Sequence, residues 1–455
     1  MSPSASDDPK QPVRTLDDLC IPFFHAIKPA HEARIGAEAE KFGVDAKTGA
    51  ALPYEGERSV MAVLQALVER HGWHAEAESK GGPLIALARA GASVTLEPGG
   101  QLELSGAPLE NVHLICTEMS GHLAELRDIS EELGIVWLGV GFHPFARQAD
   151  LGWVPKARYK IMREYLPRQG AYGLDMMRRT ATVQANYDYA SEETAMRMMR
   201  VSLRLSPVVT AMFANSPFYE GQAFGGKSYR AKVWLDVDPT RQGLVPRVLA
   251  EKTRFVDYVE WALDAPMFVV KRAGEVHDAS RITFRQFMEA GAFGTHATMS
   301  DWETHLNTMF PEVRLKKTIE VRGADSLPAS LACALPALWA GIFYDPRALD
   351  AADELSVSFS HDELLELRKE IPGAALGATF RGKPLADLAQ QVVEIAMGGL
   401  ERRARLNRNG RDERAHLDRL AELVGKGQSP ADVLLEGLGA EGTDLRKEIL
   451  VRARV

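Results

Sequence analysis

The sequence predicts an α+β protein in which helices surround a mainly antiparallel sheet. Two observations support this fold class. Stretches in which apolar and polar residues alternate, the pattern of a half-buried strand, are separated by longer stretches with helical periodicity. The two kinds of stretch do not follow one another in the regular order of a parallel βαβ fold, so we expect most strands to pair with antiparallel neighbours.

Five regions carry the alternating pattern of a strand. The clearest spans residues 313–322, where the even-numbered residues are polar and the odd-numbered ones mostly aliphatic. The others are residues 34–40, residues 182–188, a hairpin of residues 94–97 and 101–104, and residues 228–233. Their polar residues include Glu38, Glu40, Glu97, Glu103, Gln184, Asn186, Arg230, Glu320 and Arg322.

Two interpretations of these polar faces are open. A polar strand face in an antiparallel sheet often lies in water. Carboxylates two residues apart, as at Glu38 and Glu40, repel one another unless a cation lies between them, and oxygen-rich clusters of this kind bind divalent metals. The sequence therefore predicts either a metal-and-anion site or a solvated face.

Helical periodicity covers residues 59–71, 109–133, 191–214 and 245–262, and a capping box at Ser300–Glu303 predicts a short helix toward Phe310. Beyond about residue 350 the strand pattern ends and the sequence becomes helical and charged. The polar, Pro-rich residues 1–15 are expected to be a disordered tail, with nothing that resembles a signal peptide, which predicts a cytoplasmic protein.

Composition excludes several classes of function. The chain has 54 Lys and Arg against 62 Asp and Glu, and this net charge of -8 argues against general nucleic-acid binding. The longest apolar run, residues 331–344, contains Pro336 and is shorter than the roughly 20 residues of a membrane span. Three cysteines without CxxC spacing suggest neither a structural zinc site nor a secreted disulfide scaffold.

One motif has the letters of a phosphate-binding loop. Residues 221–228 match G-x-x-x-x-G-K-[ST], but that loop functions only between a strand and a helix, where backbone N–H groups surround the phosphates. Here a helix end precedes the motif and an alternating strand is expected after it. We therefore interpret residues 221–228 as a flexible loop near the substrates.

Several motifs together resemble the plant and proteobacterial type of glutamate–cysteine ligase. They include Ile35–Gly43 (IGAEAEKFG), Leu96–Glu110 (LEPGGQLELSGAPLE), Arg158–Arg163 (RYKIMR), Gly173–Met177 (GLDMM), Phe213–Phe218 (FANSPF), Phe310–Lys316 (FPEVRLK) and Glu320–Asp325 (EVRGAD). The resemblance extends from about residue 20 to the C-terminus. It implies a curved, glutamine-synthetase-like catalytic sheet, with a catalytic core over residues 16–350 and a helical C-terminal region over residues 351–455 packed on that core.

The resemblance also implies an activity. That family joins the γ-carboxylate of glutamate to the amine of cysteine with ATP, through a γ-glutamyl phosphate, as the first step of glutathione synthesis. Phosphoryl transfer is needed because a carboxylate is a poor electrophile, and it concentrates negative charge that Mg²⁺ and cationic side chains must balance. The expected cofactor is Mg²⁺, and the expected partners are glutamate, cysteine and ATP, with a chain that is a monomer or a weak homodimer.

Site residues follow from the resemblance. Arg158 and Arg230 resemble the arginines that hold glutamate, and Arg322 could stabilise the transferring phosphoryl group or orient Glu320. A surface arginine, or a simple Glu320/Arg322 charge pair, is the structural alternative. Gln184 and Asn186 are expected to complete the metal shell or contact substrate. The expected magnesium ligands or their immediate shell are Glu38, Glu40, Glu97, Glu103 and Glu320.

Cys116 and Cys333 occupy positions where related enzymes have a disulfide-forming pair, so we expect them to lie in contact. Cys20 has no remaining partner for a second pair. Two other functions stay open at this point: a ligase of the same fold with a different amine acceptor, and a catalytically silent protein that binds metal or nucleotide.

Overall fold

The computed structural model describes residues 11–76, 82–272, 274–438 and 444–455. The predicted tail therefore lies mostly outside the described residues. Its last residues are ordered, contrary to the prediction, because Val13 is buried and its N–H donates to the carbonyl of Ala297 at 3.0 Å. In the described part of the chain, no helix is both long and apolar enough to cross a membrane.

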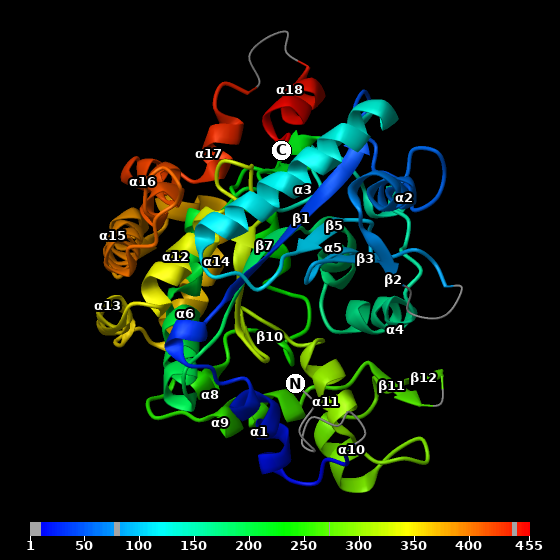
Figure 1. The fold of residues 1–455 in the computed structure, drawn as a ribbon, viewed down its shortest axis with the longest axis vertical. Coiled ribbons are helices and arrows are strands. Elements are labelled where there is room, and N and C mark those ends of the chain that lie inside the picture. The colour runs from blue at the N-terminus through cyan, green and yellow to red at the C-terminus, as the bar shows by residue number, and fades with distance from the viewer. Residues whose placement is uncertain (1–10, 77–81, 273, 439–443) are drawn as a thin grey trace.

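The α+β prediction is confirmed: a large sheet with antiparallel pairing crosses the molecule, and helices surround it (Figure 1). Eight strands follow one another across this sheet, and β6 (Ile135–Leu138) pairs with the far end of β1. In spatial order the eight are β14 (Val313–Leu315), β15 (Ile319–Asp325), β7 (Thr182–Tyr187), β1 (Ile35–Asp45), β5 (Leu102–Ser105), β4 (Ala92–Leu96), β3 (Ala86–Arg89) and β2 (His74–Glu76).

One face of the sheet is apolar and is covered by helices. In β7 the odd-numbered residues are aliphatic or aromatic, and Tyr187 donates from this face to the carbonyl of Pro336 at 2.9 Å. That carbonyl belongs to α12 (Ala334–Phe343), while α3 (Val112–Leu133) runs beside β1 and α6 (Glu192–Met212) packs on β15 (Figure 1). The even-numbered residues of β7, Thr182, Gln184 and Asn186, belong to the opposite, polar face.

Most predicted helices are present within a few residues of their predicted limits. Helix α2 (Val60–His71) is capped by Ser59, and α3 is capped by Asn111. The predicted helix 245–262 is two helices, α8 and α9, because Arg254 begins a new capping box with Asp257. The predicted capping box at Ser300 is also shifted: Thr298 caps α11 and pairs with Asp301.

The remaining helices complete the molecule. Beyond residue 350 the described residues form helices, turns and a short hairpin of β16 (Thr379–Phe380) and β17 (Lys383–Pro384). Residue 350 itself lies inside α13, so a domain boundary there would divide a helix. The helices not yet given are α1 (Leu16–His25), α4 (Ala157–Tyr165), α5 (Gly173–Arg179), α7 (Tyr229–Val233), α8 (Pro246–Leu249), α9 (Phe255–Leu263), α10 (Phe284–Ala290), α11 (Met299–Leu306), α13 (Pro346–Ser356), α14 (His361–Ala374), α15 (Leu385–Arg403), α16 (Asp418–Gly425), α17 (Pro430–Leu435) and α18 (Leu445–Arg452), with a 3₁₀ helix η6 (Glu413–His416) before α16.

Small two-stranded sheets lie outside the large one. Strands β10 (Gln242–Gly243) and β13 (Phe310–Pro311) are parallel, whereas β8 (Phe218–Tyr219) with β9 (Gln222–Ala223) and β11 (Val269–Arg272) with β12 (Glu275–Asp278) are antiparallel.

Two of the predicted strands have a different structure. Residues 228–233 form no strand: the Ser228 hydroxyl caps α7 by accepting from the N–H of Ala231, so the cations of this segment lie on a short helix. Residues 313–322 form two strands, β14 and β15, that turn back at residues 316–318. The turn places Arg314 directly opposite Glu320.

Candidate active site on the polar face of the sheet

The register of the central strands brings the predicted carboxylates together. Glu40 on β1 lies opposite Glu103 on β5, and Glu38 lies opposite Gln184 on β7. Glu97 follows β4 in a tight turn, in which its N–H donates to the carbonyl of Gln101 at 2.9 Å. Four carboxylates from three neighbouring parts of the chain therefore share one region of the polar face.

Electrostatics show that this region is rich in negative charge. Burial, followed by the charges of Glu97 and Glu103, raises the pKa of Glu40 well above its usual range, against the opposing effect of Arg230 and Arg322. Burial and the charges of Glu38 and Glu97 likewise raise the pKa of Glu103 to about 8. A divalent cation would remove this repulsion, so the side chains present fit a metal ion with oxygen ligands.

Amide side chains tie the carboxylates to the next strand. The amide nitrogen of Asn186 donates to Glu38 at 2.9 Å, and Gln184 accepts from Arg322 at 2.6 Å. The N–H of Thr182 donates to Glu40 at 3.1 Å. These contacts fix Glu38 and Glu40 on one side, and Arg322 on the other side, of β7.

Glu320 has a different environment from the other carboxylates. It is fully buried and binds Arg314 through two oxygens at 2.8 and 3.0 Å, and Lys316 at 2.7 Å. Arg322 also binds it. Burial alone would raise the pKa of Glu320, but the three cations hold it well below its usual range. With its oxygens engaged in this way, Glu320 is placed to orient Arg322.

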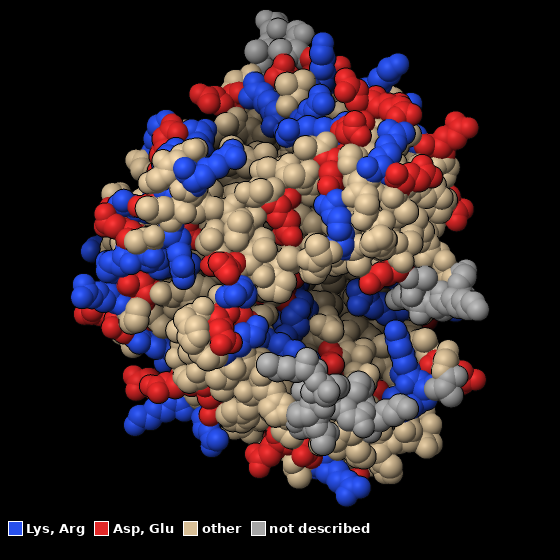
Figure 2. Space-filling model, in the orientation of Figure 1, with Lys and Arg blue, Asp and Glu red and all other residues tan. Residues whose placement is uncertain are grey.

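The predicted arginines meet at one cavity of about 90 Å³. Arg158 from α4, Arg230 from α7 and Arg322 from β15 line it together with Glu40 and Glu97. A smaller adjoining cavity of about 30 Å³ shares Arg230 and Arg322 and adds Glu312 and Arg368. Figure 2 shows the molecule hollowed on this side, with Lys and Arg side chains along the walls of the hollow.

Arg230 is the most firmly fixed of these arginines. It is buried, with only 4% of its surface exposed, and it donates to the carbonyls of Arg322 at 2.9 Å and Gly323 at 3.3 Å. Asp325 lies 3.9 Å away, and the Nε of Arg230 has no hydrogen-bond partner among the described residues. A buried guanidinium with one open donor, on the wall of a cavity, is suited to an anionic ligand.

Sequence reasoning missed several residues that support the site. Arg314 and Lys316 were assigned only to a strand face, although they neutralise Glu320. Asp325 is buried, accepts from the Ser216 hydroxyl at 2.6 Å and binds Ser228, which fixes the start of α7. Both groups stand inside motifs of the sequence, FPEVRLK and EVRGAD. Glu320 reaches Arg314 and Lys316 only through the turn at residues 316–318, whereas the partners of Asp325 lie about a hundred residues away along the chain.

The loop at residues 221–228 has no free phosphate-binding backbone at its end. The N–H groups of Lys227 and Ser228 donate to the carbonyl of Pro372 at 2.8 and 3.2 Å, and the Lys227 ammonium binds Asp432 at 2.6 Å. The prediction of a strand after this loop is wrong, because the helix α7 follows it. That helix has only five residues.

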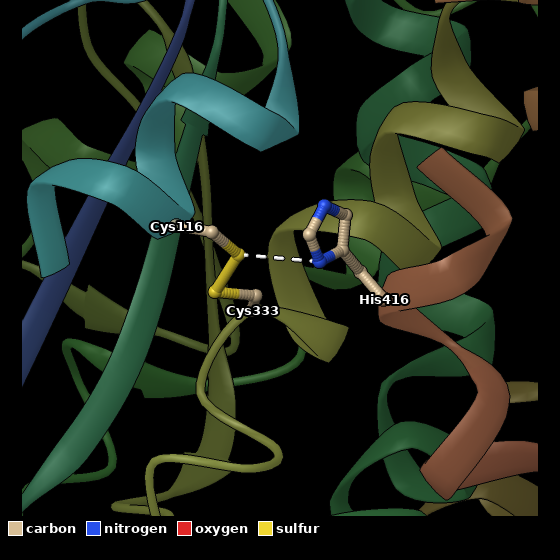
Figure 3. Close-up of side chains that lie close together, drawn as sticks. All are labelled: Cys116, Cys333 and His416. Carbon is tan, nitrogen blue, oxygen red and sulfur yellow. Dashed lines mark hydrogen bonds between the residues drawn. A yellow bond between two sulfur atoms is a disulfide. The ribbon is translucent and has the colours of Figure 1, made fainter. Parts of the chain in front are cut away.

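Cys116 and Cys333 form a disulfide, with their Cα atoms 5.8 Å apart, and Cys20 is a buried free thiol. The sulfur of Cys116 also lies 3.3 Å from Nδ1 of His416 (Figure 3). Over the described residues, these three are the only group of acidic, His or Cys side chains with ligand atoms all within 4.8 Å of one another. The carboxylates of the sheet are therefore neighbours without converging on a point.

Comparisons with known proteins agree with the family resemblance. The model of the glutamate–cysteine ligase family 2 matches residues 34–449. The chain is 42% identical to the chloroplastic glutamate–cysteine ligase of Brassica juncea, over 94% of this chain and 82% of that one. It is likewise 42% identical to the chloroplastic enzyme of Arabidopsis thaliana, over 94% of this chain and 80% of that one.

A solved structure supports the fold. The glutamate–cysteine ligase of Francisella tularensis, in complex with AMP, superposes with a TM-score of 0.57 at 12% identity, over 94% of this chain and 88% of that one. The predicted glutamine-synthetase-like sheet is confirmed.

The predicted cytoplasmic location is contradicted by the relatives, because those from Brassica, Nicotiana, Oryza and Arabidopsis are all named chloroplastic enzymes. The N-terminal composition was thus a poor guide to location. The family match and the extent of these identities show that the chain belongs to the glutamate–cysteine ligase family 2.

Proposed function

We propose that the polar face of the sheet, between Glu40 and Arg322, is where this glutamate–cysteine ligase forms γ-glutamylcysteine. The γ-phosphoryl group of ATP is transferred to the γ-carboxylate of glutamate, and the cysteine amine then displaces phosphate. The observation that carries this assignment is the single cavity in which Glu40 and Glu97 stand beside Arg158, Arg230 and Arg322. Phosphoryl transfer needs this combination of oxygen ligands and cations.

The carboxylates have the task of holding Mg²⁺. We assign Glu38, Glu40, Glu97 and Glu103 to this task, because acidic neighbours raise the pKa values of Glu40 and Glu103, and a divalent cation between these carboxylates would remove the repulsion. When bound, Mg²⁺ supplies a Lewis acid that neutralises the phosphate oxygens. Glu320 is assigned a different role, since three cations already occupy its oxygens.

The arginines divide the remaining tasks. Arg230, fixed by backbone carbonyls and with an open Nε, is placed to bind a carboxylate of glutamate, and Arg158 lies on the same cavity wall. Arg322 is held by Gln184 and Glu320 with its guanidinium at the cavity. In this position it stabilises negative charge that develops on the transferring phosphoryl group.

The test is a coupled assay of ADP release together with mass spectrometry of the product. Purified protein with Mg²⁺, ATP, glutamate and cysteine should release ADP and form γ-glutamylcysteine. Replacing cysteine with other amino acids tests the acceptor. If ADP release with both amino acids is no faster than without them, the assignment is wrong.

A further inference from the structure

The disulfide between Cys116 and Cys333 has a histidine in contact with it, in a place remote from the carboxylates of the sheet. Cys116 belongs to α3, Cys333 precedes α12, and His416 ends η6, so three segments far apart in sequence meet here (Figure 3). The sulfur of Cys116 and Nδ1 of His416 are 3.3 Å apart. In a tetrahedral zinc site, with Zn–S of about 2.3 Å and Zn–N of about 2.0 Å, a sulfur and a nitrogen lie about 3.5 Å apart.

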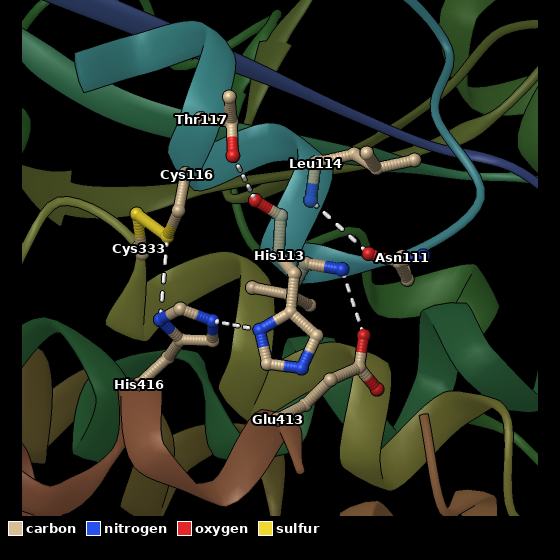
Figure 4. The surroundings of a disulfide bond; sticks show 9 residues. Asn111, His113, Leu114, Cys116, Thr117, Cys333, Glu413 and His416 are labelled. Atoms are coloured by element: carbon tan, nitrogen blue, oxygen red, sulfur yellow. Dashed lines mark hydrogen bonds between the residues drawn. A yellow bond between two sulfur atoms is a disulfide. The ribbon is translucent and has the colours of Figure 1, made fainter. Parts of the chain in front are cut away.

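A chain of hydrogen bonds fixes which nitrogen of His416 carries a proton. Nε2 of His113 lies 3.1 Å from the carbonyl of Arg405, which can only accept, so Nε2 of a neutral His113 carries its proton. Nδ1 of His113 therefore accepts from Nε2 of His416, at 2.8 Å (Figure 4). Nδ1 of His416 is left with a lone pair, and it is this atom that faces the sulfur.

The arrangement has the features of a metal site with its supporting shell. A histidine ligand in proteins almost always donates its second N–H to an acceptor, which fixes the orientation of the ring. His416 does so to His113, and His113 does so to a backbone carbonyl. Such an arrangement is not required by a disulfide, whose sulfurs carry no proton and accept hydrogen bonds only weakly.

We propose that, once the disulfide is reduced, Cys116, Cys333 and His416 bind a thiophilic divalent cation of the Zn²⁺ class. A dithiol reductant supplies two electrons and two protons, so that the S–S bond is replaced by two thiols while the reductant becomes a disulfide. The cation then displaces both thiol protons and forms two metal–sulfur bonds and one bond to Nδ1. Two thiolates and one neutral imidazole are ligands that Zn²⁺ prefers.

A groove leaves room for a fourth ligand. Its volume is about 680 Å³, and Cys116 and His416 line it together with Asn111, Thr117 and Ser120. It is open to solvent, because Leu114 and Leu406 at its edge are 42% and 63% exposed. Water can complete the coordination, as in zinc sites that have three protein ligands.

The bound cation would replace the disulfide as a link between the same segments. In the oxidised chain a covalent bond joins α3 to the start of α12; in the reduced chain the cation would join both of them to η6. This inference does not rest on the proposed function, since none of the three ligands lines the cavity that contains Glu40 and Arg322.

The experiment is an anaerobic titration with Co²⁺, which replaces Zn²⁺ and is visible by its absorption. The intact chain is reduced, freed of reductant and titrated, and a second sample is left oxidised. We expect one equivalent of Co²⁺ to give thiolate-to-cobalt charge-transfer absorption and the visible bands of tetrahedral cobalt in the reduced sample only. The oxidised sample is a control with an unchanged sequence, so it does not depend on whether a variant folds.

Variants identify the ligands. Cys116→Ser and Cys333→Ser should each remove or shift the charge-transfer band, whereas Cys20→Ser should leave it unchanged because that thiol is buried elsewhere. His113→Ala should weaken Co²⁺ binding by about 10- to 100-fold, and His416→Ala by more. The proposal is overturned if reduced protein gives no charge-transfer band, if the band survives in the Cys116→Ser/Cys333→Ser double variant, or if His416→Ala binds Co²⁺ as tightly as the unchanged chain.

Discussion

Glu40 and Glu320 stand on the same polar side of one sheet, two strands apart, and have opposite electrostatic surroundings. Around Glu40 the largest charges are those of Glu97 and Glu103, and its pKa is raised. Around Glu320 they are those of Arg314, Lys316 and Arg322, and its pKa is lowered. Acidic neighbours thus dominate around Glu40, although Arg230 and Arg322 oppose them, whereas three cations of the protein bind Glu320.

The difference shows that burial alone does not identify a metal ligand. Both residues follow the same alternating pattern, and both motifs resemble the same family. What separates their roles is whether side chains of the protein already neutralise the charge. The predictions below use this contrast, since substitution should affect stability at Glu320 and activity at Glu40.

Replacing Glu320 should have the largest effect. Glu320→Ala leaves Arg314, which is 8% exposed, buried without its carboxylate, and breaking a buried ion pair in this way costs about 3–5 kcal/mol. Denaturant titration measures the free energy of unfolding. The matched control is Glu303→Ala, which removes an exposed ion pair with Lys317 and should cost about 0–1 kcal/mol. Equal losses in the two variants would contradict the assigned role of Glu320.

Replacing Glu40 should reduce activity without reducing stability. Glu40→Gln removes a proposed metal ligand, so kcat/KM for ADP release should fall by about 10²- to 10³-fold, the range for loss of one group that stabilises the transition state. Without Mg²⁺ the variant should unfold no more easily than the unchanged chain, because a repelling charge is gone. Glu57→Gln, at an exposed carboxylate, is the control. Full activity in Glu40→Gln would show that this face of the sheet does not take part in the reaction.

Replacing Arg230 should weaken glutamate binding specifically. Arg230→Lys keeps the charge but loses the planar fork, and hydrogen bonds to charged groups contribute about 1.5–3 kcal/mol, so KM for glutamate should rise by about 10- to 100-fold. Steady-state kinetics at saturating ATP and cysteine measures the KM for glutamate, and circular dichroism checks the fold. Arg347→Lys, at an exposed arginine, should change nothing. A rise in KM for ATP alone would assign Arg230 to the nucleotide instead.

The smallest effect, counted per pH unit, is a dependence of the free energy of unfolding on pH. Since the folded pKa of Glu103 is raised to about 8, the folded chain binds more protons than the unfolded chain between about pH 4.5 and 8. Stability without Mg²⁺ should therefore fall as pH rises through this window, by up to about 1.4 kcal/mol per pH unit for one group. Thermal unfolding at a series of pH values measures the slope.

Glu103→Gln should flatten that slope, and Mg²⁺ should reduce it in the unchanged chain by favouring the charged carboxylate. Parallel profiles for the two chains would show that Glu103 is not the titrating group.

The sequence predicted those elements whose local pattern agrees with their packing. Residues 35–40 alternate because one side of β1 lies on helices, so the strand was found. Residues 228–233 alternate as well, but Ser228 caps a helix on which Tyr229 and Val233 are both buried. So short a segment fits both the two-residue period of a strand and the 3.6-residue period of a helix. The turn at residues 316–318 contains no Gly, Pro, Asn or Asp to mark it.

The residues proposed for the site could be named from the sequence, but their contacts could not. Glu40, Arg230 and Arg322, which the resemblance proposes as site residues, line one cavity. The pairing of Glu320 with Arg314 depends on the unexpected turn. No pattern in the sequence therefore indicated that Arg314 would neutralise Glu320. Sequence motifs thus propose which residues take part, while the role of each depends on neighbours that only the fold brings near.

Crystals grown with Mn²⁺ and a non-hydrolysable ATP analogue would test the contrast between Glu40 and Glu320 most directly, because Mn²⁺ is located by its anomalous scattering. We predict anomalous peaks beside Glu40 and its neighbours Glu38, Glu97 and Glu103, with Glu320 still bound to Arg314. A peak on Glu320 with Arg314 displaced, and none beside Glu40, would contradict the account.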